Sequence, residues 1–70
     1  MRLNYEPHFK IVTTIQNVLI NNEFVSYNTN CFLDTNSIYS NSKGIWYGKI
    51  YTLFRQPIGV INLSYIKIVK

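Results

Sequence analysis

The side chains that could carry acid–base, nucleophilic or metal chemistry are few and widely spaced in this chain. Its 70 residues include one histidine, one cysteine and three acids, namely His8, Cys31, Glu6, Glu23 and Asp34. A metal site needs several nitrogen, sulfur or oxygen ligands at compatible spacing, and these five residues form no such cluster. The glycines are far apart, so a glycine-rich phosphate loop is missing as well. We expect neither a metal site nor a cofactor.

A nucleophile pair of Cys31 with His8 is the enzymatic arrangement that the residue types allow. Cys31 stands in the apolar stretch Asn-Cys-Phe-Leu, where a free cysteine behaves as a small buried hydrophobe. Nucleophilic catalysis also needs a base, an orienting group and an oxyanion donor, which the remaining polar residues do not supply together. We therefore expect a protein that is not an enzyme, with Cys31 as an inert, mostly buried thiol.

The elements around these residues are predicted to be strands. The chain has ten Ile, six Tyr, four Phe and one Trp, and it has no alanine. Aromatic and β-branched residues fit a pleated, half-buried surface, whereas alanine is the best helix former. Composition therefore predicts one small all-β domain over residues 1–70, with a core built from large side chains because so short a chain buries little surface.

The alternation of apolar and polar residues places these strands. We expect strands at 2–6, 9–15, 24–33 and 45–54, and a last one that follows a turn at 55–57. Asn21-Asn22 is predicted to form a hairpin turn, since Asn tolerates the left-handed conformation. The polar residues 34–44 read as a long loop. Strand 45–54 carries aromatics on both faces, which favours a central position in the sheet. In the last strand, the apolar residues change from one face to the other between Tyr65 and Ile66, as they would at a bulge or a single helical turn.

The C-terminal third resembles the end of an SH3 domain. The run Gly59–Val69 has the glycine, polar corner, Tyr and β-branched strand of that family's closing motif, and the pair Trp46-Tyr47 stands where the family has its aromatic pair. The resemblance implies a small five-stranded SH3-like β-barrel. An open OB-like barrel is the alternative fold.

The resemblance also implies an interaction surface. It puts Tyr5, Trp46 and Tyr65 at positions that line the family's peptide groove, and it puts Asn62 where that groove has a proline. Loss of the proline, and the absence of any acid from residues 8–22, predict that basic polyproline peptides are not the ligand. Trp46 and Tyr65 could instead close the barrel as core or rim residues without a ligand.

The function that we expect is that of a non-enzymatic accessory subunit docking on a larger multi-subunit assembly, such as a photosynthetic or other organellar complex. Exposed aromatics are typical interface anchors, and no small-molecule substrate is expected. One alternative is an SH3-type peptide-binding module. The second is a nucleic-acid-binding or ribosome-associated barrel, for which the net charge of +4 is the hint. That alternative requires scattered cations to converge on one face: Lys43, Lys49, Arg55 and Lys67.

The same residues indicate a compartment. A lone cysteine cannot form an internal disulfide, and no secretory signal or transmembrane segment is visible. We expect a soluble protein in a reducing compartment, the cytoplasm or an organelle interior, including the periphery of a membrane complex. The abundance of Asn, Ile, Tyr and Lys is typical of an AT-rich genome.

Overall fold

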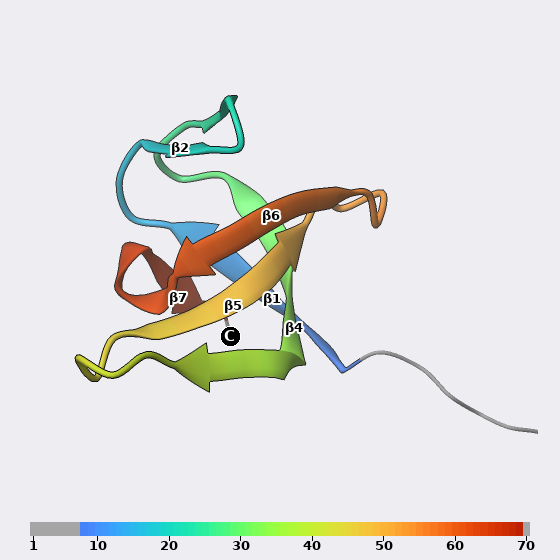
Figure 1. Ribbon diagram of the computed structural model, residues 1–70. Helices are drawn as coiled ribbons and strands as arrows, with labels where there is room; N and C mark the ends of the chain where they lie inside the picture. Colours follow the sequence, from blue (N-terminus) through green and yellow to red (C-terminus); the bar gives the residue numbers. More distant parts are fainter. Residues whose placement is uncertain (1–7, 70) are drawn as a thin grey trace, which may run out of the picture.

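A computed structural model describes residues 8–69, and most of these residues lie in strands (Figure 1). The elements in chain order are β1 (Phe9–Thr14), β2 (Val18–Ile20), β3 (Glu23–Val25), β4 (Asn30–Ser40), β5 (Trp46–Tyr51), β6 (Pro57–Asn62), the 3-10 turn η1 (Leu63–Tyr65) and β7 (Ile66–Ile68). The prediction of an all-β domain is confirmed. The predicted strand at 2–6, and Tyr5 with it, lie outside the described residues.

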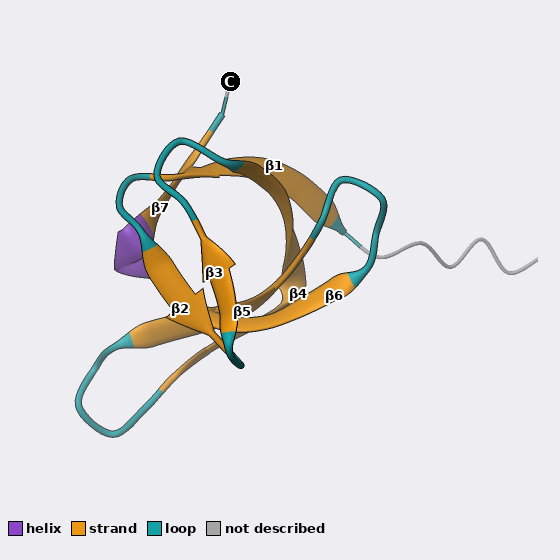
Figure 2. Cartoon of the chain, turned by 90° about the horizontal axis from the view of Figure 1, so that it is seen from above, coloured by secondary structure: helices purple, strands orange, loops and turns teal. Residues whose placement is uncertain are grey.

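Five strands form one antiparallel sheet in the order β6-β5-β4-β1-β7, and β2 and β3 form a separate hairpin. Seen from above, the sheet curls strongly and the hairpin lies across it (Figure 2). The hairpin is held against β6, because the Asn21 side-chain amide donates to the carbonyl oxygen of Ile58 at 3.4 Å. A Cβ at Gly59 would stand 2.6 Å from Ile20 Cγ2, so the close approach of hairpin and β6 depends on that glycine.

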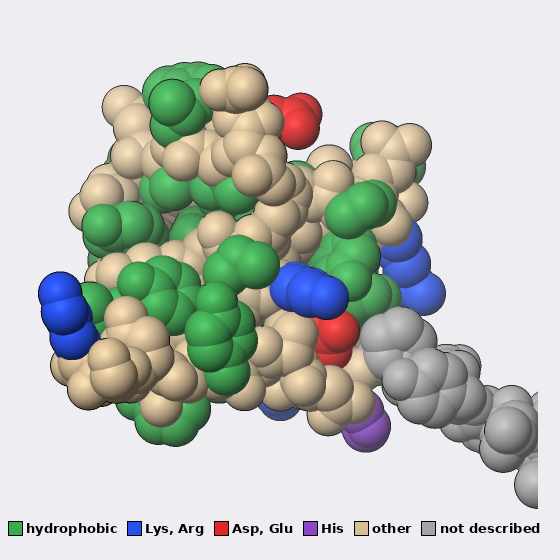
Figure 3. All heavy atoms as spheres, in the orientation of Figure 1, with side chains coloured by type: hydrophobic (Ala, Val, Ile, Leu, Met, Phe, Trp, Pro, Cys, Tyr) green, Lys and Arg blue, Asp and Glu red, His purple; other side chains and the backbone are tan. Residues whose placement is uncertain are grey.

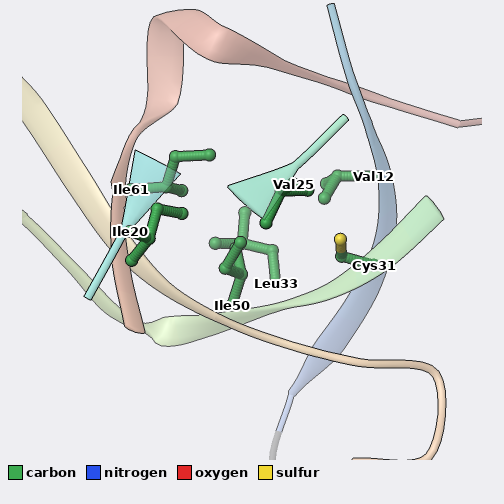
Figure 4. Packing of buried hydrophobic residues seen from close by; sticks show 7 residues of the cluster. All are labelled: Val12, Ile20, Val25, Cys31, Leu33, Ile50 and Ile61. Carbon is green, nitrogen blue, oxygen red and sulfur yellow. The ribbon is translucent and has the colours of Figure 1, made fainter. Parts of the chain in front are cut away.

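The core is aliphatic and draws on six strands. Figure 4 shows its seven residues pointing toward one another: Val12, Ile20, Val25, Cys31, Leu33, Ile50 and Ile61. No aromatic residue within 8–69 is buried, so the large side chains that form the core are aliphatic. A strongly curled sheet leaves a narrow interior that branched aliphatic side chains fill, and the rings lie over its surface instead.

The predicted turn at Asn21-Asn22 and the central position of the strand that contains Trp46-Tyr47 are confirmed. The turn expected at 55–57 comes earlier, since β5 ends at Tyr51 and Pro57 already begins β6. Asn21 and Asn22 both have positive φ, 49° and 66°, at the β2–β3 turn. Strand β5 lies between β4 and β6, although it is shorter than predicted and ends at Tyr51. The phase switch after Tyr65 is the single 3-10 turn η1, at whose start the Asn62 side chain accepts a hydrogen bond from the Ser64 backbone.

The predicted strand at 24–33 is wrong. Strand β3 ends at Val25, and the chain turns before β4 begins. The reason is Thr14, whose hydroxyl donates to the carbonyl oxygen of Ser26 at 2.6 Å and accepts from the backbone N–H of Thr29 at 2.9 Å. Two backbone bonds also join Thr14 to the turn, from its N–H to the carbonyl oxygen of Thr29 at 3.0 Å and from the N–H of Asn28 to its carbonyl oxygen at 2.8 Å.

The predicted loop at 34–44 is wrong over residues 34–40, since β4 continues to Ser40, whereas residues 41–44 do form the loop between β4 and β5. Its pairing with β5 shifts register between Asp34 and Tyr39. Within this bulge the Asp34 carboxylate accepts from the Asn36 N–H at 3.0 Å, and the Ser37 hydroxyl donates to the Asp34 carbonyl oxygen at 2.6 Å. The polar residues that read as a loop thus satisfy the backbone of a bent strand.

Candidate protein-interaction surface

One groove brings together two of the residues expected to form an interaction site. It has a volume of about 520 Å³ and is lined by Gly44, Ile45, Trp46, Asn62, Leu63 and Ser64. One wall is therefore the end of the β4–β5 loop with the start of β5, and the other is the end of β6 with η1. We call this hollow the Trp46 groove.

Both walls are fixed by asparagine side chains. In the β4–β5 loop, the Asn41 side-chain oxygen accepts from the N–H groups of Lys43 at 2.9 Å and Ile45 at 3.0 Å. On the opposite wall, the Asn62 oxygen accepts from the backbone N–H and the hydroxyl of Ser64, both at 2.9 Å. Such short-range hydrogen bonds define tight turns, so the groove is formed before any partner arrives.

Trp46 is the most prominent side chain of the groove. Its strand phase is that of Gly48 and Ile50, which are buried, yet 53% of Trp46 is exposed. The difference arises from position, because Trp46 begins β5 opposite Ser40 near the end of β4, away from the buried stretch of both strands. The ring can therefore contact a partner while the Trp46 backbone stays paired in β5.

The other expected site residues lie elsewhere. Tyr65 is half-buried, packs against the core and is not among the lining residues of the Trp46 groove. Tyr5 lies outside residues 8–69. Sequence reasoning missed Tyr39, which is 50% exposed and stacks on Tyr47 with ring centroids 5.5 Å apart. The apolar pair Ile38-Tyr39 could have indicated a strand, but the polar residues on both sides of it led to the prediction of a loop.

The groove has no negative charge. Its lining contains no Asp or Glu, and in the part of the chain that the structure describes the acids are Glu23 on β3 and Asp34 on β4. A basic peptide in the Trp46 groove would meet no carboxylate among the lining residues. This matches the absence of acids from residues 8–22 in the sequence.

The cations stand on separate elements. Arg55 lies in the β5–β6 loop with its guanidinium 5.3 Å from the ring centroid of Phe9 and 5.6 Å from that of Phe32, which are contacts within the fold. Lys49 and Lys67 line separate hollows. Figure 3 shows Lys and Arg side chains standing apart on the face that it presents.

Cys31 and His8 are not neighbours. Cys31 is 1% exposed and pairs with Val12 on β1. His8 precedes Val12 by four residues, which is about 13 Å along a strand. Burial raises the pKa of the Cys31 thiol above its ordinary value, which disfavours the thiolate that a nucleophile requires.

Neither a metal site nor a membrane-spanning helix is found among the described residues. Between His8 and Val69, no three His, Cys, Asp or Glu side chains stand close enough to hold a metal ion. No helix in the same stretch has the length and apolar character needed to cross a membrane. No family model matches the chain, and no curated protein and no solved structure was found to be similar to it.

Proposed function

We propose that this chain adopts an SH3-like fold and acts as a non-enzymatic subunit that docks on a larger protein assembly through the Trp46 groove. The fold proposal is supported by the strand order β6-β5-β4-β1-β7, the hairpin after β1 and the single 3-10 turn before the last strand. It is also supported by the resemblance of Gly59–Val69 to the SH3 closing motif.

One observation carries the docking proposal, namely an exposed tryptophan at the edge of a preformed groove. Tryptophan is among the residues that contribute most to protein–protein binding. Since Asn41 and Asn62 fix the two walls, little side-chain freedom is lost when a partner binds, which favours affinity. A partner side chain or loop that fills the groove would cover the Trp46 ring.

The charges around the Trp46 groove favour a protein surface as the ligand over a basic polyproline peptide and over a nucleic acid. A polyproline peptide with Arg or Lys gains no charge-assisted hydrogen bond where the lining contains no acid. A nucleic acid gains most where cations cluster, whereas Arg55 lies over the rings of Phe9 and Phe32 and Lys49 and Lys67 line separate hollows.

The experiment compares Trp46→Ala with Phe54→Ala in capture of partners from an extract of the source cells. Phe54 is the matched control because it is an exposed aromatic, 88% accessible, in the β5–β6 loop and not in the groove. We expect wild type and Phe54→Ala to retain the same protein partner and Trp46→Ala to lose it, at a cost of about 2 kcal/mol in binding. Thermal unfolding should show all three folded.

Three results would contradict the docking proposal. Trp46→Ala could unfold, which would make Trp46 a structural residue. The partner could persist with Trp46→Ala, which would put the interface elsewhere. The captured material could disappear on nuclease treatment or on adding a basic PxxP peptide at micromolar concentration, which would favour the nucleic-acid or the peptide alternative.

A further inference from the structure

The polar groups that the Trp46 groove keeps for a partner are mainly hydrogen-bond donors. The indole N–H of Trp46 can only donate, and 53% of Trp46 is exposed. On the opposite wall, the Asn62 side-chain oxygen accepts from the N–H and the hydroxyl of Ser64, which fills both of its lone pairs. The Asn62 amide then has its NH2 group left, and this group also only donates. Within residues 8–69, neither donor is engaged in a hydrogen bond.

The acceptors of the adjoining β4–β5 loop are already in use. The Asn41 side-chain oxygen accepts from the N–H groups of Lys43 and Ile45. The Asn41 carbonyl oxygen accepts from the Gly44 N–H, and the Ile45 carbonyl oxygen accepts from the Asn41 N–H, both at 3.0 Å. A partner therefore meets more donors than acceptors at the Trp46 groove, which selects for a ligand group that accepts hydrogen bonds.

The charge around the Trp46 groove has the same preference. Its lining contains no Asp or Glu, and the exposed Lys43 directly precedes the lining residue Gly44. Hydrogen bonds to a carboxylate are roughly twice as strong as those to a neutral carbonyl, and a cation in the adjoining loop favours a negative charge. The carboxylate of an Asp or Glu side chain is the acceptor in proteins that complements these donors best.

The rest of the lining is mainly apolar. The Trp46 ring, Ile45 and Leu63 line the same hollow as Asn62, and its volume of about 520 Å³ is within the range of about 300–1,000 Å³ that is typical of ligand sites. An aliphatic side chain against the Trp46 ring would bury apolar surface. The ligand that fits both parts of the lining has an aliphatic side chain next to a carboxylate.

We infer that the partner segment that enters the Trp46 groove is acidic, with Asp or Glu next to an aliphatic residue. The aliphatic side chain packs on the Trp46 ring, and the carboxylate accepts from the Asn62 amide, with the Trp46 indole N–H as the second donor. Asn62 is then the residue that sets the charge specificity of the groove. This choice of partner rests on the docking function proposed for the same groove.

The test is a titration of the full chain with capped pentapeptides, followed by NMR through the resonances of Ile45 and Leu63. The acidic probe is acetyl-Gly-Asp-Leu-Asp-Gly-amide, in which side chains provide the only carboxylates. Its neutral and basic counterparts have Asn or Lys in place of Asp, and a fourth probe has Gly in place of Leu. We expect the acidic peptide to bind about tenfold more tightly than the Asn peptide, and high salt should reduce this difference. The Lys peptide and the peptide without Leu should bind more weakly than the acidic one.

Asn62→Asp reverses the polarity of the groove and keeps its shape. The variant retains an oxygen for the two bonds from Ser64, but a second carboxylate oxygen takes the place of the NH2 group. We expect the acidic peptide to bind about tenfold more weakly and the Lys peptide to bind more tightly. The matched control is Asn28→Asp, which adds the same charge at an exposed position outside the lining and should leave both affinities within about twofold.

Trp46→Phe tests the second donor. It keeps an aromatic ring and removes the indole N–H, so the preference for the acidic peptide over the Asn peptide should fall about threefold. Thermal unfolding checks that each variant is folded. Because Trp46 is half exposed, Trp46→Phe should remain folded, and it decides the case if Asn62→Asp unfolds.

Several outcomes would overturn the acidic partner. They are equal affinity for the acidic and the Asn peptide, tighter binding of the Lys peptide, or no saturation at millimolar acidic peptide. An unchanged preference in folded Asn62→Asp would also overturn it, as would an unchanged preference in Trp46→Phe if Asn62→Asp unfolds. A thymidine oligonucleotide that shifts Ile45 and Leu63 at a lower concentration than the acidic peptide would favour a nucleic acid instead.

Failure of the acidic partner and failure of the docking function give different results. If Trp46→Ala loses the captured partner while the peptides show no charge preference, the docking function stands and the acidic partner is wrong. If Trp46→Ala retains the captured partner, the docking function itself is contradicted.

Discussion

At the scale of single residues, burial decides what Cys31 can do. Its side chain is 1% exposed between strands, and desolvation raises the pKa of the thiol. The thiolate is the reactive form, so both the low access and the raised pKa slow its reaction. We expect alkylating reagents to label Cys31 slowly in the native protein and rapidly after denaturation, as mass spectrometry over time would show. Rapid native labelling would contradict this picture.

The raised pKa of Cys31 has a consequence for stability. Below the ordinary thiol pKa of 9.0, the thiol is protonated in both the folded and the unfolded state, so it adds no pH dependence. Above 9.0 the unfolded state loses the proton first, and the free energy of unfolding falls as pH rises. Urea unfolding of wild type and Cys31→Ala at pH 7 and pH 10 tests this. We expect wild type to be more stable at pH 7, by about 1 kcal/mol for a small core truncation, and the difference to shrink at pH 10.

At the scale of elements, one side chain of β1 contributes two hydrogen bonds to the turn at 26–29, in addition to the backbone bonds between Thr14 and residues 28 and 29. Thr14 is 1% exposed, and its hydroxyl bonds both Ser26 and Thr29. Thr14→Val keeps the shape but removes two part-buried hydrogen bonds, which costs about 1–3 kcal/mol. Urea unfolding would measure this loss in the free energy of unfolding.

Thr13→Val is the matched control for Thr14→Val. The Thr13 hydroxyl donates to the side chain of Asn30 at 2.6 Å, and Asn30 is exposed, so water can replace that bond. We expect a loss below about 1 kcal/mol. Equal losses in the two variants would mean that Thr14 does not hold the turn.

At the scale of the whole molecule, the five-stranded sheet joins strands from the two ends of the described chain. Strand β7 pairs with β1 through Ile66↔Thr14 and Ile68↔Val12. Pairing between distant segments has a high loop-closure cost, so all-β domains fold in about milliseconds to seconds. Stopped-flow circular dichroism should show a β-type signal that appears on this timescale, and deletion of residues 66–70 should prevent it. A spectrum with about one third helix, or folding within microseconds, would contradict the fold.

The sequence by itself determined the β class, the two-residue turn at Asn21-Asn22, the central position of the strand that contains Trp46-Tyr47, and the turn between Asn62 and Ile66. Each of these depends on local composition, on period-two alternation or on residues that tolerate particular φ values, which neighbouring residues suffice to set.

Only the tertiary structure decided the rest. Residues 34–40 belong to a strand because the neighbouring strands β1 and β5 pair with it, and Asp34 and Ser37 satisfy its bulge. The residues of the core are aliphatic, and the rings are half-buried or exposed around them. Trp46 and Asn62 line one groove only because distant strands come together. These outcomes depend on long-range pairing and on the shape of the interior, which no local pattern of residues contains.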